Sequence, residues 1–207
     1  MFRFCEKTLL LLRAAEWSED RHSSIADNYV RLLGKEGFIV SKNIKEFLYK
    51  FGGLSIRHPH AKCKDITDYF HFDVIKALSS GDTSWVLEVY SSRIGKNLCI
   101  IGEAFRRSMV LCMAPNKEVY AGIDEKLFYI GDSGESAIES LCNGHELKVI
   151  PEYFSELEAA RVVYAKYHSY QLYKPYPDGR IQENYSQIPY FLYQSVLTNN
   201  QQTISAY

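Results

Sequence analysis

Histidine and cysteine side chains that could hold a metal ion gather in one short stretch of the sequence. His58, His60 and Cys63 are spaced as His-x-His-x-x-Cys, and His71 follows. Zinc binds such side chains, but a structural zinc site needs four of them in a tetrahedral array. Pro59 separates the two histidines and a lysine stands on each side of Cys63, which disfavours a cation. We therefore interpret the stretch as a polar loop between two strands and expect no metal.

Cysteine catalysis is the other chemistry that the residue types offer. It needs a thiolate beside a histidine in a partly exposed, electropositive setting. Cys142 lies three residues before His145, whereas Cys99 and Cys112 lie in apolar runs typical of buried strands. The sequence contains no paired-carboxylate motif and no glycine-rich phosphate loop. We therefore expect neither enzymatic activity nor a cofactor. The enzymatic alternative, which ranks third among the functions considered below, is a small-molecule hydrolase that uses Cys142 or another thiol.

The elements that carry these residues begin with helices. Apolar side chains recur at helical spacing in three segments near the N-terminus, residues 9–17, 24–37 and 41–53. Ser24 and Ser41 are expected to cap the second and third helices, and Gly52-Gly53 to end the third with a left-handed residue.

From Leu54 onward the pattern changes to short apolar or alternating runs separated by turn residues, which is typical of strands. The runs are 54–57, 69–72, 86–91, 98–105, 109–113, 119–123 and 127–130. The short connection between Met113 and Val119 favours an antiparallel hairpin. A further helix is expected between Asp132 and Gly144. The fold class predicted is α+β, with N-terminal helices on a mainly antiparallel sheet of about six strands and a closing helix.

Pro151 marks the predicted domain boundary. Residues 1–150 form the expected domain, and residues 151–207 form a tyrosine-rich C-terminal extension that holds 10 of the 16 tyrosines. Helical spacing predicts a helix over 152–170, followed by a loop and an irregular segment, because Pro175 and Pro177 both break helices.

The overall composition excludes several classes of protein. The chain has 207 residues, 46% of them hydrophobic and 24% charged, with a formal net charge of −1. A net charge near zero shows no excess of basic residues of the kind that binds nucleic acid. No apolar run approaches the roughly 20 residues that span a bilayer. The five cysteines are odd in number and contain no Cys-x-x-Cys pair. We therefore expect a cytoplasmic protein without a membrane or nucleic-acid partner.

Several segments, taken in order, resemble the third subfamily of the SUKH superfamily. The resemblance covers about residues 8 to 145 and is carried by Leu12-Arg13-Ala14-Ala15-Glu16-Trp17-Ser18, Glu36-Gly37-Phe38, Phe47-Leu48-x-x-Phe51-Gly52-Gly53-Leu54, Tyr90-Ser91-x-x-Ile94-Gly95, Ile101-Gly102-Glu103-Ala104 and Ile130-Gly131-Asp132-Ser133. It implies the α+β SUKH fold and a bacterial immunity protein that blocks a secreted polymorphic toxin by binding it in the cytoplasm. Residues 146–207 lie outside this pattern.

The positions that match the family are interpreted as structural. Trp17 can bury a large apolar area at a helix end. Gly52, Gly53 and Gly102 are explained by backbone conformation or close packing.

Two groups of residues are the candidates for contact with a partner. Acidic side chains follow one another through the later turns and the start of the closing helix, at Glu118, Asp124, Glu125, Asp132 and Glu135. Such a patch could fill the cationic cleft of a nuclease toxin, although turns and first helical turns are commonly acidic. Tyr173 and Tyr176 lie in the predicted loop of the extension, where tyrosine supplies rigid contact area. In the other interpretation of the extension, its predicted helix over 152–170 packs on the sheet and adds a layer to the core.

The function predicted is therefore a non-enzymatic immunity protein whose partner is a cognate toxin, a nuclease being one candidate. We expect a monomer or a weak homodimer. The alternative is a SUKH-type interaction scaffold in signalling or cell-wall regulation, and the presence of an upstream toxin gene would separate the two.

Overall fold

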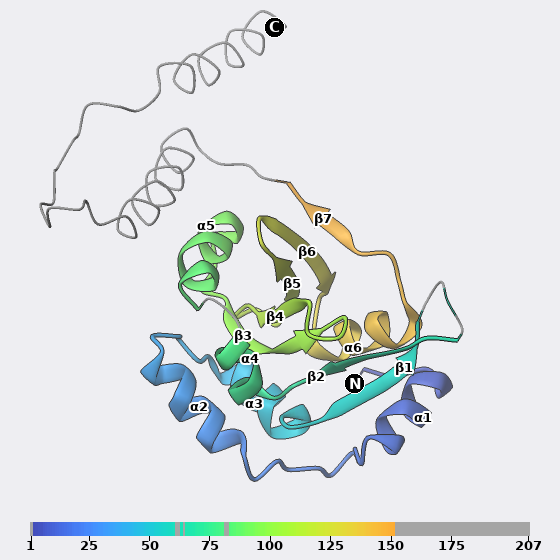
Figure 1. Cartoon of the computed structure of the whole chain (residues 1–207). Coiled ribbons are helices and arrows are strands. Elements are labelled where there is room, and N and C mark those ends of the chain that lie inside the picture. The colour runs from blue at the N-terminus through green and yellow to red at the C-terminus, as the bar shows by residue number, and fades with distance from the viewer. Residues whose placement is uncertain (1, 61–62, 64, 81–82, 152–207) are drawn as a thin grey trace, which may run out of the picture. The chain divides into compact units, whose positions relative to one another are not determined.

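In the part of the chain that the structure describes, seven strands form one antiparallel sheet, and each strand pairs with the next along the chain (Figure 1). The computed structural model describes residues 2–60, 63, 65–80 and 83–151. The strands are β1 (Ser55–Pro59), β2 (Thr67–His71), β3 (Cys99–Ala104), β4 (Met109–Met113), β5 (Val119–Ile123), β6 (Lys126–Gly131) and β7 (Lys148–Ile150). The predicted α+β class and antiparallel sheet are confirmed, with one strand more than the expected number.

Helices cover both faces of this sheet. They are α1 (Glu6–Ala14), α2 (Ala26–Lys35), α3 (Lys42–Phe51), α4 (Val74–Ser80), the π-helix η1 (Trp85–Tyr90), α5 (Ser91–Ile94) and α6 (Gly134–Asn143). On one face Phe47 of α3 packs edge-on against Phe72 at 4.9 Å between ring centroids. Phe47 also lies against Gly134 at the start of α6. On the other face Tyr90 of η1 covers Gly122 of β5, and α4 packs on β3.

Local signals in the sequence set the ends of α3 and α6. The Ser41 side chain accepts a hydrogen bond from the Ile44 amide and caps α3. Ser133 and Ser136 form a capping box at α6, and Gly144 ends that helix with φ 65°. After α3 the left-handed residue is Gly53, with φ 83°. The expected Ser24 cap is wrong, because the residue before α2 is Ile25 and no side chain caps that helix.

The run 86–91, expected to be a strand, is helical instead. It forms η1 and the first residue of α5. Trp85 Nε1 and the Tyr90 hydroxyl both donate to the Asp124 carbonyl, at 2.9 Å and 2.7 Å. These contacts with the β5–β6 turn override the β-propensity of the valines and the tyrosine.

Strand β7 and helix α4 lack a clear signal in the sequence. Arg93 of α5 donates hydrogen bonds to the carbonyls of Glu125, Ile150 and Pro151. This guanidinium fixes the short β7 at the edge of the sheet. The helix, loop and irregular segment predicted beyond Pro151 lie outside the described residues.

The sheet is weakest between β2 and β3. These strands share a single register pair, His71 with Glu103, whereas β1 and β2 share five. Gly102 makes this approach possible, because a Cβ there would lie 1.9 Å from the His71 carbonyl oxygen. The seam between the β1–β2 hairpin and the remaining strands therefore depends on a glycine and on the side chains beside it.

We predict that Gly102→Ala lowers the free energy of unfolding by about 2 kcal/mol or more, because the new methyl group must displace backbone. Urea unfolding measures the change. Gly34→Ala is the matched control, since Gly34 lies exposed in α2 with nothing within 4 Å of the added Cβ. In this control the free energy of unfolding is expected to rise by about 0.5–1 kcal/mol, because alanine has a higher helix propensity than glycine. Equal stability of the two variants would contradict the proposed role of Gly102.

Candidate functional site

A buried carboxylate lies at the seam between β2 and β3. The side chains of Glu103 and His71 are each only 4% exposed, and His71 Nε2 lies 2.8 Å from Glu103 Oε2. Ser80 at the end of α4 donates its hydroxyl to the other carboxylate oxygen. Arg107 Nε donates to Oε2 at 2.8 Å. Three elements thus supply the hydrogen bonds that a buried carboxylate needs.

The second nitrogen of His71 fixes its protonation state. The Asp73 amide donates to Nδ1 at 3.2 Å, so Nδ1 is an acceptor and the proton resides on Nε2, where it is donated to Glu103. Burial lowers the pKa of His71, although the neighbouring Glu103 opposes that shift. His71 is therefore a neutral donor in the folded protein.

The network continues from His71 to the helices. The Asp73 carboxylate pairs with Lys76 at 3.2 Å and accepts a hydrogen bond from the Tyr29 hydroxyl. Burial opposes ionisation of Asp73, but the hydrogen bonds from Lys76 and Tyr29 outweigh it and lower its pKa. Arg21 lies beside Tyr29 and donates to the Gly52 carbonyl at 2.9 Å. Polar contacts thus link α2 and the end of α3 to the seam.

The turn between β3 and β4 carries this network to the surface. Phe105, Arg106 and Arg107 all have positive φ, at 52°, 57° and 69°. This left-handed conformation costs roughly 1–2 kcal/mol for a residue with an ordinary side chain. The Arg106 amide donates to the Tyr69 carbonyl of β2 at 3.2 Å, so the turn lies against the β1–β2 hairpin.

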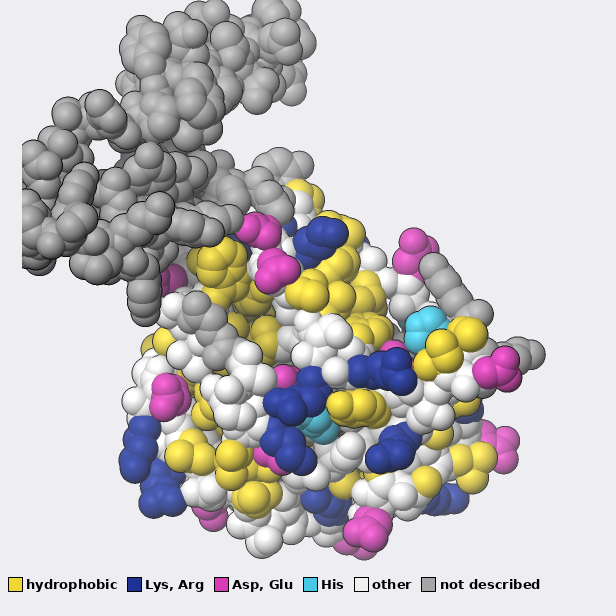
Figure 2. All heavy atoms as spheres, in the orientation of Figure 1, with side chains coloured by type: hydrophobic (Ala, Val, Ile, Leu, Met, Phe, Trp, Pro, Cys, Tyr) yellow, Lys and Arg dark blue, Asp and Glu magenta, His cyan; other side chains and the backbone are white. Residues whose placement is uncertain are grey.

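Basic side chains surround this turn. Arg57 is the register partner of Tyr69, and the alternating burial of β1 places Arg57 on the exposed side of the hairpin. Figure 2 shows Lys and Arg side chains gathered in the middle of this face, over α4, β2 and the β3–β4 turn. We name Arg57, Lys76, Arg106 and Arg107 the arginine face.

The predicted acidic contact residues fall at opposite ends of the β5–β6 hairpin. Val119 pairs with Gly131, which brings Glu118 near Asp132 at one end. Asp124 and Glu125 form the turn at the other end. The structure therefore does not bring the acidic set together into one patch.

The acidic side chains of Glu118, Asp132 and Glu135 are engaged by residues of the domain. Glu118 pairs with Lys96 and accepts from the Tyr120 hydroxyl at 2.6 Å, and both contacts lower its pKa. Asp132 accepts from the Tyr129 hydroxyl. Glu135 pairs with Lys50 at 3.0 Å. Tyr173 and Tyr176 lie outside the described residues.

The family positions lie in the core or against it. Trp17 stacks on Phe51, with 5.9 Å between the ring centroids. The Gly52 carbonyl accepts from Arg21 and from the Ser23 hydroxyl. The added Cβ at Gly53 would lie 3.6 Å from Ile25, an ordinary contact, so the positive φ is what requires glycine there.

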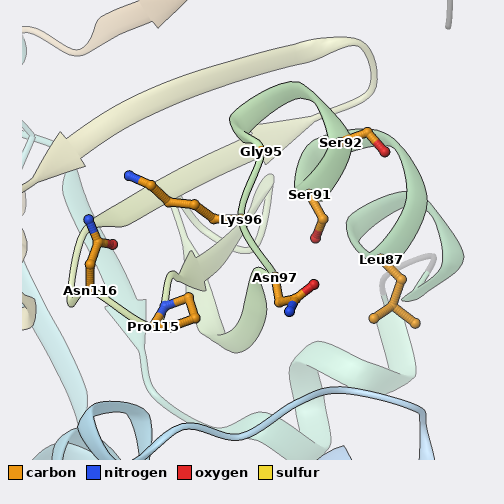
Figure 3. A pocket seen from close by; sticks show the side chains of 8 residues that line it. All are labelled: Leu87, Ser91, Ser92, Gly95, Lys96, Asn97, Pro115 and Asn116. Carbon is orange, nitrogen blue, oxygen red and sulfur yellow. The ribbon is translucent and has the colours of Figure 1, made fainter.

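An open pocket of about 520 Å³ lies between α5 and the β4–β5 turn. Figure 3 shows Lys96 and Asn116 on one side and Leu87, Ser91 and Ser92 on the other. Lys96 is engaged by Glu118, and the Ser91 hydroxyl is engaged by the Val86 carbonyl and the Leu98 amide. Lys96 and Ser91 thus serve the fold.

The three buried cysteines, Cys99, Cys112 and Cys142, are poorly suited to nucleophilic chemistry. Burial raises the pKa of Cys99 and of Cys142 to about 12, and it raises that of Cys112 as well. A thiol with such a pKa is protonated at neutral pH and is a weak nucleophile.

The stretch that resembled a metal site is dispersed in the fold. His58 turns toward the core and packs near Phe70, whereas His71 faces Glu103 on the other side of the sheet. Among the described residues, no three histidine, cysteine or acidic side chains are grouped as metal ligands. None of the helices in the described part of the chain combines the length and apolar character that crossing a bilayer demands.

Sequence reasoning did not single out the arginine face. Its residues come from β1, α4 and the β3–β4 turn, and no local spacing unites them. One signal was available, because Phe105-Arg106-Arg107-Ser108 joins two strands without the glycine, asparagine or aspartate that a left-handed turn prefers.

The lowered pKa of His71 predicts a pH dependence of stability. Its folded pKa lies below the ordinary value of 6.5. The unfolded chain therefore binds this proton first as the pH falls, and stability is lost below about pH 6.5 with a slope of at most about 1.4 kcal/mol per pH unit. We predict that His71→Gln, whose amide can still donate to Glu103, loses less stability than the wild type between pH 7.5 and 5. Urea unfolding at both pH values measures the difference, and a steeper loss in the variant would contradict the assignment.

Comparison with known proteins finds one family model that matches the chain, that of the SUKH-3 immunity protein, over residues 4–144. Searches of curated proteins and of solved structures return no match. The matched segment covers about two thirds of the chain and includes every described helix and the strands β1 to β6. This confirms the resemblance seen in the sequence: the chain belongs to the SUKH-3 immunity protein family.

Proposed function

We propose that this protein neutralises a cognate secreted toxin in the bacterial cytoplasm by stoichiometric binding, without chemistry of its own. Membership of an immunity protein family is the observation that carries the proposal. The buried thiols with raised pKa support a binding role over a thiol enzyme.

Inhibition would then follow from occlusion. A rigid domain that covers the toxin's active site, or a surface next to it, excludes the substrate without altering any covalent bond. For a nuclease toxin, whose cleft must attract phosphate, the acidic β5–β6 turn at Asp124 and Glu125 is the proposed steering element. Tyr173 and Tyr176 remain proposed contact residues.

Co-expression with the toxin domain encoded by the neighbouring gene tests the function. We predict that the full-length chain restores growth of cells that express the toxin and that the two proteins elute together in size-exclusion chromatography. An unrelated immunity protein of similar size serves as the control. Continued killing together with separate elution would overturn the proposal.

The steering role of the β5–β6 turn has its own test. The double variant Asp124→Asn and Glu125→Gln removes both charges, and asparagine tolerates the φ of 48° at position 124. We predict an association rate with a basic toxin about tenfold lower at low salt, with a smaller difference at high salt. Stopped-flow fluorescence measures both rates. Equal rates for the variant and the wild type at low salt would exclude this turn as a steering element.

A further inference from the structure

We propose that the arginine face (Arg57, Lys76, Arg106 and Arg107) is the docking surface for a carboxylate-rich surface of the toxin. This inference deepens the proposed function and rests on it. It names the surface of this chain that makes the contact and the chemistry of the partner that fits it.

The conformation of the β3–β4 turn is the first support. Three consecutive residues with large side chains hold a left-handed backbone that glycine or asparagine adopts more readily. Strain of this kind persists where the surrounding structure enforces it, and it concentrates at binding sites. The turn presents two adjacent guanidinium groups where two small residues would fold more easily.

The anchoring of Arg107 is the second support. Its Nε is bound to the buried Glu103, and Glu103 is held by Ser80 and by the neutral His71. The Arg107 side chain is nevertheless 41% exposed. One edge of the guanidinium is thus fixed toward the protein, and its remaining N–H donors are available to a bidentate carboxylate. A preorganised side chain loses little entropy when it binds.

The balance of charge is the third support. Lys76 is offset by Asp73, and Arg107 is offset by Glu103. Arg57 and Arg106 have no carboxylate within ion-pair distance among the described residues, and both are exposed. The face therefore keeps an excess of positive charge in a chain whose formal net charge is −1. Such local excess attracts an acidic surface of a partner and repels a basic surface.

The other side chains on this face favour a protein over a nucleic acid. Tyr69 is half-buried, lies opposite Arg57 and accepts from the Arg106 amide through its carbonyl, and Ile75, the residue before Lys76 on α4, is 44% exposed. Arginine and tyrosine with a neighbouring aliphatic side chain form the composition of protein interface hot spots. Nucleic-acid sites instead carry a longer basic stripe that follows the phosphates.

Binding of the purified toxin domain to full-length variants, measured by calorimetry, tests the inference. Arg57→Glu combined with Arg106→Glu is expected to weaken affinity by about 100-fold. Arg106→Gly is expected to weaken affinity by about tenfold while leaving the melting temperature equal or higher, because glycine suits the positive φ. Arg106→Lys, which keeps the charge but loses the planar fork, is expected to fall between Arg106→Gly and the wild type.

The matched control is Lys7→Glu combined with Arg13→Glu. This double variant changes the net charge by the same amount, but on α1, which packs with α6 on the other side of the sheet. Its affinity for the toxin domain is expected to stay within about threefold of that of the wild type.

The outcomes separate this inference from the proposed function. Neutralisation by the wild type, with unchanged affinity in the Arg57→Glu and Arg106→Glu double variant and in Arg106→Gly, would overturn the inference and leave the proposed function standing. Absence of a complex with the wild type would overturn the proposed function and the inference with it. Binding of a single-stranded RNA of about 20 nucleotides that Arg57→Glu and Arg106→Glu abolish, with toxin affinity unchanged, would also overturn the inference and assign the face to nucleic acid.

Discussion

The fold depends on one buried charge, the carboxylate of Glu103. Taking a carboxylate out of water costs several kcal/mol unless hydrogen bonds replace the lost solvent. Here the replacements come from α4, β2 and the β3–β4 turn, through Ser80, His71 and Arg107. These elements must stay together for the charge to remain satisfied. The β1–β2 hairpin, which shares only one register pair with β3, is thereby held to the sheet by side chains more than by a strand ladder.

The same constraint shapes the exposed surface. Arg107 reaches Glu103 from a turn that lies against β2, and the left-handed residues 105 to 107 produce that path. The Arg106 amide completes it by donating to the Tyr69 carbonyl. The same turn conformation therefore supplies the hydrogen bond that the buried Glu103 needs and places Arg106 and Arg107 at the surface. A turn of glycine and asparagine would relieve the backbone, but it would leave Glu103 without its charged partner.

The sequence predicts the parts of the fold that local rules control. Amphipathic spacing and serine caps identify α3 and α6, and the short connection after Met113 identifies the β4–β5 hairpin. Local rules fail for the run 86–91, because its conformation is decided by the distant Asp124 carbonyl. They also fail for the Glu103 network, whose partners Ser80 and His71 are 23 and 32 residues away in the chain. The family glycine at 102 was predicted to be structural, and its reason is visible only once the His71 carbonyl lies above it.

The near-zero net charge conceals a separation of the two signs over the surface. Acidic side chains at the ends of the β5–β6 hairpin are mostly matched by lysines or tyrosines within the domain. On the arginine face, Arg57 and Arg106 form no ion pair with a described carboxylate. A partner recognised by such a surface must present both an acidic contact for the arginines and a spacing that fits a rigid turn. Because the turn is held by the buried carboxylate, the surface cannot easily rearrange to suit another partner. Charge placed on a rigid backbone favours discrimination between related partners, since a mismatched partner leaves desolvated arginines without acceptors.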